Sequence, residues 1–143
     1  MALLSSSELA ARAENAITSR TFEAVLLNIG TDLLSANSSY ASLVANEVST
    51  DNGGYTRIQF SFTSSDIVES ATGAKTAKRF LTWFHDGTSG DIVFDALLIV
   101  ERIAAQPLDQ YNVVALESLG IPYTLSLAGD RGRFSFSINV RDK

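Results

Sequence analysis

The residues with the most evident potential for chemistry are His85 and Asp86, which are adjacent in the segment His85-Asp86-Gly87-Thr88-Ser89-Gly90. A histidine oriented by a carboxylate acts as a general base when a nucleophile lies within reach. The chain contains no Gly-x-Ser-x-Gly motif, which would signal a nucleophilic serine on a strand-to-helix turn. The glycines favour a turn, so we interpret His85 as a turn residue. An enzyme that uses His85 and Asp86 is the third-ranked class, and we predict no catalytic residue and no enzymatic activity.

Metal and cofactor sites are also not predicted. Asp86, Asp91 and Asp95 could offer oxygen ligands to calcium, but their spacing does not match a calcium-binding loop. Asp91 and Asp95 are better interpreted as solvent-facing residues on one face of a strand. The chain has one histidine and no cysteine, which excludes thiolate sites, disulfides and histidine-rich metal centres. Two glycine-rich segments, Gly53-Gly54 and Gly129 to Gly132, lack the Lys-Ser/Thr of a phosphate-binding loop.

Composition limits the classes of partner. The 143-residue chain has a formal net charge of −5, which disfavours a dedicated nucleic-acid binder. No apolar run approaches the roughly 20 residues of a membrane span, and the N-terminus does not resemble a signal peptide. Residues 1–56 hold six acidic and two basic side chains, whereas residues 130–143 hold four basic and two acidic ones. This asymmetry fits an ordinary solvated surface, and it also fits complementary patches that meet between subunits. Lys75, Lys78 and Arg79 form a small basic cluster with the same two interpretations.

The elements that position these residues are mostly strands. Residues 91–102 alternate briefly and then run apolar from Leu97 to Val100, which predicts a central strand covered on both faces. A capping-box pattern at Ser5 and Glu8 predicts a helix over residues 5–19. Residues 24–29 fit either a helix or a buried strand by periodicity, and residues 40–44 suggest one helical turn.

Further strands follow from alternation and from turn residues. We predict a turn at Asp51 to Gly54, a strand over 57–63, an exposed loop over 64–78, a strand over 79–84, and a short strand over 111–116 after a break at Gln106-Pro107. Residues 123–127 and 133–141 alternate on either side of a glycine turn and are predicted to form a hairpin. Trp83 and Phe84 face opposite sides of their strand, so one belongs in the core.

The fold class is therefore mainly β, a β-sandwich or open barrel with one N-terminal helix. We divide the chain into an N-terminal helical arm, residues 1–20, and a β domain, residues 21–143.

One segment resembles a known family. Asn46-Glu47-Val48-Ser49, followed by Asn52-Gly53-Gly54-Tyr55-Thr56-Arg57 and an alternating strand, is similar to the Asn-Glu-Val-Ser-Gly-Gly-Gly-Tyr-Ala-Arg signature of small phage structural proteins labelled tail-fibre proteins. In that family a short helix and a buried strand precede the signature, and a tryptophan-containing strand and a hydrophobic strand follow it. The same order here favours a strand at residues 24–29. Thr50-Asp51 interrupts the signature, and the resemblance covers about residues 20–102.

The resemblance implies a virion component without catalytic residues. We therefore expect a non-catalytic structural subunit of a phage-like virion, either decorating the capsid or associated with the tail, that forms homo-oligomers and binds other virion proteins but neither nucleic acid nor membrane. The alternative is a small carbohydrate- or peptide-binding β-module in which Trp83 and the loops at 64–78 and 86–90 form the site.

Overall fold

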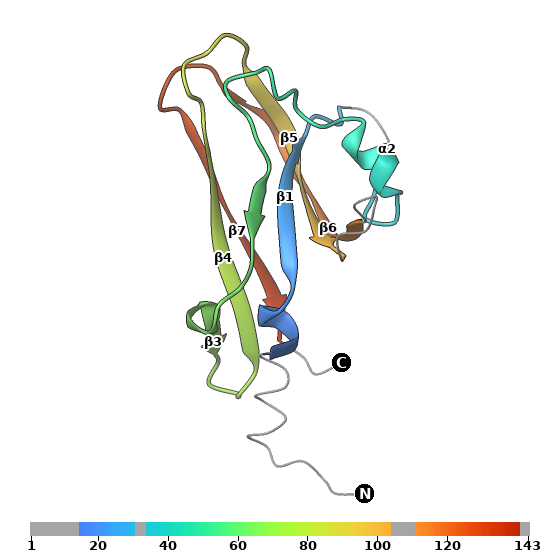
Figure 1. Ribbon diagram of the computed structural model, residues 1–143, viewed down its shortest axis with the longest axis vertical. Coiled ribbons are helices and arrows are strands. Elements are labelled where there is room, and N and C mark those ends of the chain that lie inside the picture. Colours follow the sequence, from blue (N-terminus) through green and yellow to red (C-terminus); the bar gives the residue numbers. More distant parts are fainter. Residues whose placement is uncertain (1–14, 31–33, 104–110, 141–143) are drawn as a thin grey trace, which may run out of the picture.

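The chain folds into two antiparallel sheets that pack face to face as an open sandwich (Figure 1). The computed structural model describes residues 15–30, 34–103 and 111–140. The four-stranded sheet has the order β2 (Ile58–Phe60), β1 (Thr21–Leu27), β5 (Ile92–Arg102), β6 (Tyr111–Leu125). The three-stranded sheet has the order β3 (Ile67–Glu69), β4 (Lys75–Phe84), β7 (Arg131–Asn139). The mainly β class is confirmed, and the sheets form a sandwich without closing into a barrel.

Strand β5 is the interior strand that its apolar run predicts. It lies between β1 and β6, and its residues from Ala96 to Val100 are all buried. Alternate side chains, including Phe94, Leu97 and Ile99, point into the core between the two sheets. The intervening Leu98 and Val100 point to the other face of the four-stranded sheet, into a second apolar cluster. A strand buried on both faces cannot tolerate the polar alternation of a half-exposed strand, which explains the sequence pattern.

The outer face of the four-stranded sheet is covered by the segment that follows β1. Helix α2 (Tyr40–Val44) begins at the N-cap Ser39, whose hydroxyl accepts a hydrogen bond from the backbone N–H of Ser42. Its Leu43 is fully buried against Val25, Leu27 and the outward side chains of β5. The helical turn predicted over residues 40–44 is confirmed, and the strand interpretation of residues 24–29 is confirmed up to Leu27, where β1 ends.

The predicted N-terminal helix is described only at its end. Residues 15–18 are helical, and the rest of the range 5–19 up to residue 14 lies outside the described residues. Ile17 is buried in the core between the sheets, and Arg20 forms two hydrogen bonds of 2.9 and 2.7 Å with the carboxylate of Glu101 on β5. The end of this helix is therefore held against the sandwich by one apolar and one ionic contact.

The exposed loop predicted over residues 64–78 is wrong in part. A 3₁₀ turn, Ser64–Asp66, leads into the short strand β3, and β4 begins at Lys75, four residues before the predicted start. Only residues 70–74 form the connection, a tight turn in which Gly73 adopts φ +86° and Ser70 N–H donates to the carbonyl of Ala74. Small polar residues that suggest a loop are tolerated here because β3 is a short edge strand.

The single strand β6 replaces two predicted strands. The strands predicted over 111–116 and 123–127 are both parts of it, the second as far as Leu125, because pairing with β5 resumes after Gly120-Ile121-Pro122: Ser118 is opposite Ala96 and Tyr123 is opposite Phe94. Residues 119–122 form a bulge opposite Asp95, with Gly120 at φ +83°. Proline lacks an N–H donor, and a bulge on an edge strand is one of the places where a sheet accommodates it.

The predicted hairpin between residues 123–127 and 133–141 is also wrong. β6 pairs with β5, whereas β7 pairs with β4 in the opposite sheet, so the turn at 126–130 crosses from one sheet to the other. The alternation itself is confirmed, since Phe134, Phe136 and Ile138 point inward and the intervening residues are exposed. Two alternating runs joined by a short turn can lie side by side or face to face, and local sequence does not distinguish the two arrangements.

Candidate functional site

His85 and Asp86 form part of a turn, and each side chain is hydrogen-bonded to other residues of that turn. His85 is 2% exposed, its Nδ1 accepts a hydrogen bond from the Gly87 N–H at 3.0 Å, and its Nε2 lies 2.9 Å from the Gly90 carbonyl. Nδ1 is an acceptor, so Nε2 has the proton and donates it to this carbonyl. Asp86 accepts instead from the backbone and hydroxyl of Thr88, which lower the pKa of its carboxyl group. Both ring nitrogens of His85 are therefore occupied by the turn itself, as the turn interpretation predicts.

The other two aspartates have separate surroundings. Asp95 accepts hydrogen bonds of 2.8 Å from the N–H groups of Ile29 and Gly30, and it thereby holds the chain where it leaves β1. Asp91 is exposed at the start of β5. Among the described residues, no group of three or more His, Cys, Asp or Glu side chains is placed to hold a metal ion.

Two polar residues of the segment 46–57, Glu47 and Arg57, form a hydrogen-bonded network with residues of α2 and the four-stranded sheet. Glu47 accepts from Arg57 Nε and Nη2 at 2.9 and 2.8 Å, and Arg57 Nη1 also donates to the Tyr40 hydroxyl at 2.6 Å and to Glu23 at 3.3 Å. The hydrogen bond to Glu47 is the main cause that raises the pKa of Arg57 above its usual range. The Arg57 guanidinium lies over the rings of Tyr40 and Tyr111, which stack on each other at 4.8 Å.

Tyr55, the aromatic residue of the signature, connects this network to the sheet. It is 1% exposed; its hydroxyl donates to Glu47 at 2.8 Å and accepts from the backbone N–H of Leu26 on β1 at 3.1 Å. Burial raises the pKa of the Tyr55 phenol above its usual range, so the group remains neutral. Glu47 thus accepts hydrogen bonds from both Tyr55 and Arg57 within the fold.

Two further predicted candidates have internal roles. Trp83 is the core member of its pair: it is 4% exposed and its indole N–H donates to the Thr56 carbonyl at 3.0 Å, whereas Phe84 is 56% exposed. The basic cluster is divided between the two faces of β4, because Arg79 points inward and donates to the Ser61 carbonyl while Lys78 is exposed. Because Trp83 is buried, its ring is not available for stacking on a ligand.

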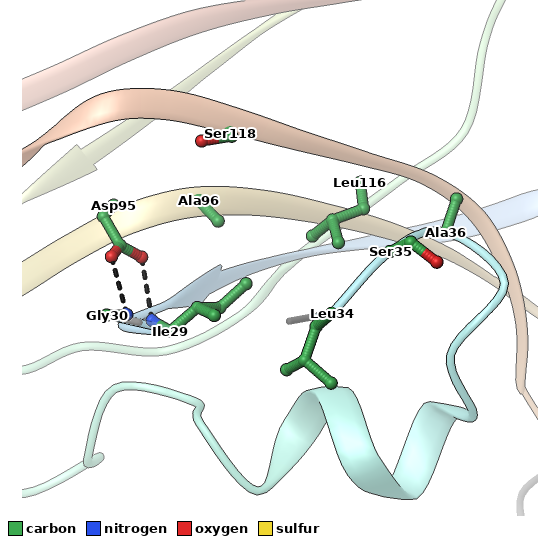
Figure 2. A pocket seen from close by; sticks show the side chains of 9 residues that line it. All are labelled: Ile29, Gly30, Leu34, Ser35, Ala36, Asp95, Ala96, Leu116 and Ser118. Carbon is green, nitrogen blue, oxygen red and sulfur yellow. Dashed lines mark hydrogen bonds between the residues drawn. The ribbon is translucent and has the colours of Figure 1, made fainter. Parts of the chain in front are cut away.

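A cavity of about 290 Å³ lies beside the bulge in β6 (Figure 2). The side chains of Ile29, Leu34 and Leu116 provide its apolar lining, and Ser35 and Ser118 provide hydroxyl groups. Asp95 lies at one side, where both of its carboxylate oxygens accept the backbone hydrogen bonds drawn in Figure 2. Asp95 is the only carboxylate among the described lining residues, and backbone N–H donors already satisfy both of its oxygens.

The most distinctive surface is the outer face of the three-stranded sheet, which we call the open face. Register places Val68, Thr76, Lys78, Phe80, Thr82 and Phe84 on this face together with Arg131, Arg133, Ser135, Ser137 and Asn139. None of these described residues is acidic. Val68, Phe80 and Phe84 are 62%, 53% and 56% exposed. Unlike the four-stranded sheet, this sheet has no described segment packed on its outer side (Figure 1).

Cations and aromatic rings are interleaved on the open face. The Arg133 guanidinium lies 4.2 Å from the centre of the Phe80 ring, and the Lys78 ammonium lies 5.1 Å from it. Exposed aromatic residues and arginine are enriched at protein interfaces, where a single ring buries a large area. Sequence analysis missed Phe80 and Arg133 as a pair because it treated β7 as the partner of β6. The alternation of Lys78, Phe80, Thr82 and Phe84 was the available signal.

Comparison of the chain with protein-family models, curated proteins and solved structures finds no match. Within the described residues, no helix is long and apolar enough to cross a membrane.

Proposed function

We propose that the chain is a non-catalytic structural subunit of a phage-like virion, attached to the capsid or the tail, that works by binding neighbouring subunits. The observation on which this proposal rests is the open face, a sheet surface with two half-exposed phenylalanines and three cations. Apolar side chains grouped on one face of a domain favour association because burial removes their surface from water.

The internal role of the signature residues supports the same proposal. Glu47, Tyr55 and Arg57 bond to one another and to β1, so a signature shared with phage structural proteins would preserve a scaffold. This is what a subunit that acts through its shape requires. The carbohydrate- or peptide-binding alternative has no comparable support, since its central residue, Trp83, is buried.

The proposal is tested in particles assembled from a phage genome that encodes this chain. We expect the chain in purified particles, and we expect the double variant Phe80→Ser/Phe84→Ser to reduce its occupancy at least about tenfold, because two rings at the centre of an interface are typical energetic hot spots. Ile121→Ser is the matched control, because Ile121 is 62% exposed on β6, away from the open face. Absence of the wild-type chain from purified particles contradicts the proposal.

A further inference from the structure

Three turns meet at one end of the sandwich, at the top of Figure 1. They are residues 49–55, residues 85–91 and residues 126–130, and backbone hydrogen bonds join them. Asp86 N–H donates to the Gly53 carbonyl at 3.0 Å, Gly129 N–H donates to the His85 carbonyl at 3.0 Å, and His85 N–H donates to the Asp130 carbonyl at 2.8 Å. The buried His85 ring packs beside Gly53, where an added Cβ would lie only 2.5 Å from it. We call this end the tip.

The tip is acidic and has one large apolar side chain that is exposed. Its three turns contain Asp51, Asp86, Asp91 and Asp130 and contain neither lysine nor arginine. Asp130 accepts from the N–H groups of Ser126 and Leu127 at 3.0 and 2.9 Å, so its carboxylate is fixed in place. Leu127, which follows Ser126 in this turn, is 71% exposed, more than any other large apolar residue in the described part of the chain.

The tip and the open face are complementary in both charge and polarity. The open face has Lys78, Arg131 and Arg133 around two exposed phenylalanines, and the tip has aspartates around an exposed leucine. Association of two open faces would bring cations together, and association of two tips would bring carboxylates together. Like charges at an interface are unfavourable, whereas opposite potentials accelerate encounter and select the partner.

We propose that the tip of one copy docks on the open face of a second copy, with Leu127 against Phe80 and Phe84. This inference rests on the proposed function and specifies its homotypic partner. Such a contact is heterologous, because two different surfaces of the same chain meet. An open assembly of any size then has one free tip at one end and one free open face at the other, so the contact repeats until a ring closes or a filament forms.

The test uses two variants of the full chain, each with one surface removed. The tip variant is Asp51→Lys/Asp91→Lys/Leu127→Ser, and the face variant is Phe84→Ser/Arg133→Glu. Glu117→Lys is the matched charge control, because Glu117 is exposed on β6 and belongs to neither surface. Sedimentation velocity and light scattering at about 50 mM salt, where the Debye length is longer than 10 Å, report association. Far-UV circular dichroism establishes that each variant is folded.

We expect the wild type and Glu117→Lys to form oligomers, and we expect each surface variant to associate at least about tenfold more weakly. An equimolar mixture of the two variants should form a dimer, because the intact tip of the face variant can dock on the intact open face of the tip variant. The dimer should grow no further, because its two remaining surfaces are the mutated ones. A tip variant that associates like the wild type overturns the inference, as does a folded mixture that stays monomeric. A wild type that is monomeric in solution overturns the inference as well. The proposed function is decided separately, by the presence or absence of the wild-type chain in purified particles.

Discussion

At the scale of single residues, several described polar side chains form hydrogen bonds that connect separate segments of the fold. Tyr55 is a clear example, because its hydroxyl bridges the Leu26 N–H and the Glu47 carboxylate inside the protein. A buried hydrogen-bonding group that loses its partner retains the full cost of its removal from water.

Tyr55→Phe should lower the free energy of unfolding by about 1–3 kcal/mol, because it leaves the Leu26 N–H without an acceptor in a buried position. Chemical denaturation measures the change. Tyr123→Phe is the matched control, because Tyr123 is 43% exposed and the loss of its hydroxyl leaves no buried group without a hydrogen-bond partner. Equal stability of Tyr55→Phe and the wild type would show that the hydroxyl does not connect the signature to β1.

Asp130→Asn tests the charge of a turn carboxylate. The N–H groups of Leu127 and Ser126 lower the pKa of the Asp130 carboxyl in the folded state. A carboxyl group whose pKa is lower in the folded state stabilises that state at pH values above its pKa in the unfolded chain, about 3.9. This contribution is lost as the pH falls through the pKa of the folded state. We therefore expect the wild type to exceed Asp130→Asn in stability at neutral pH, and the difference to vanish in strong acid. Urea denaturation as a function of pH measures it, and a difference that persists unchanged in acid would contradict the prediction.

At the scale of elements, β7 shows how one strand serves two surfaces. Its inward residues close the core, and its outward residues belong to the open face. Phe136 packs against the rings of Phe22, Phe60 and Phe62 at centroid distances of 6.2, 6.2 and 6.0 Å. Ser135 is exposed opposite Phe80.

Phe136→Ala should cost about 3 kcal/mol, at the lower end for a core phenylalanine because the side chain is only partly buried. Ser135→Ala should change stability by less than about 0.5 kcal/mol, as for other exposed substitutions. Chemical denaturation of both variants makes the comparison. If Phe136→Ala is as stable as the wild type, the strand does not close the core of its own subunit.

At the scale of the whole molecule, the chain crosses between the two sheets repeatedly. The chain passes from β4 in the three-stranded sheet to β5 in the four-stranded sheet, and from β6 in the four-stranded sheet back to β7 in the three-stranded sheet. Neither sheet is a continuous segment, so neither can unfold alone without breaking the core that both share. The structure thus implies a single cooperative unit.

Equilibrium unfolding should therefore be a single transition. Trp83 is the only tryptophan and lies in the core between the sheets, so its fluorescence reports tertiary packing while far-UV circular dichroism reports the strands. The two signals should give coincident denaturation curves in urea. A fluorescence change that precedes the loss of strand signal would show that the sheets separate before they unfold.

The sequence by itself determined the features that depend on neighbouring residues. The apolar run of β5, the alternation of β7, the turn at Asp51 to Gly54 and the turn role of His85 all follow from side-chain type and short spacing, and the structure confirms them. The tertiary structure decided which strands pair, because pairing depends on the competition among all exposed strand edges and not on local pattern. It placed β7 beside β4, and only that placement brings Arg133 over Phe80 and creates the open face. It also brought three distant turns together at the tip, where the hydrogen bonds Asp86 N–H to Gly53, Gly129 N–H to His85 and His85 N–H to Asp130 join segments that are far apart in the chain.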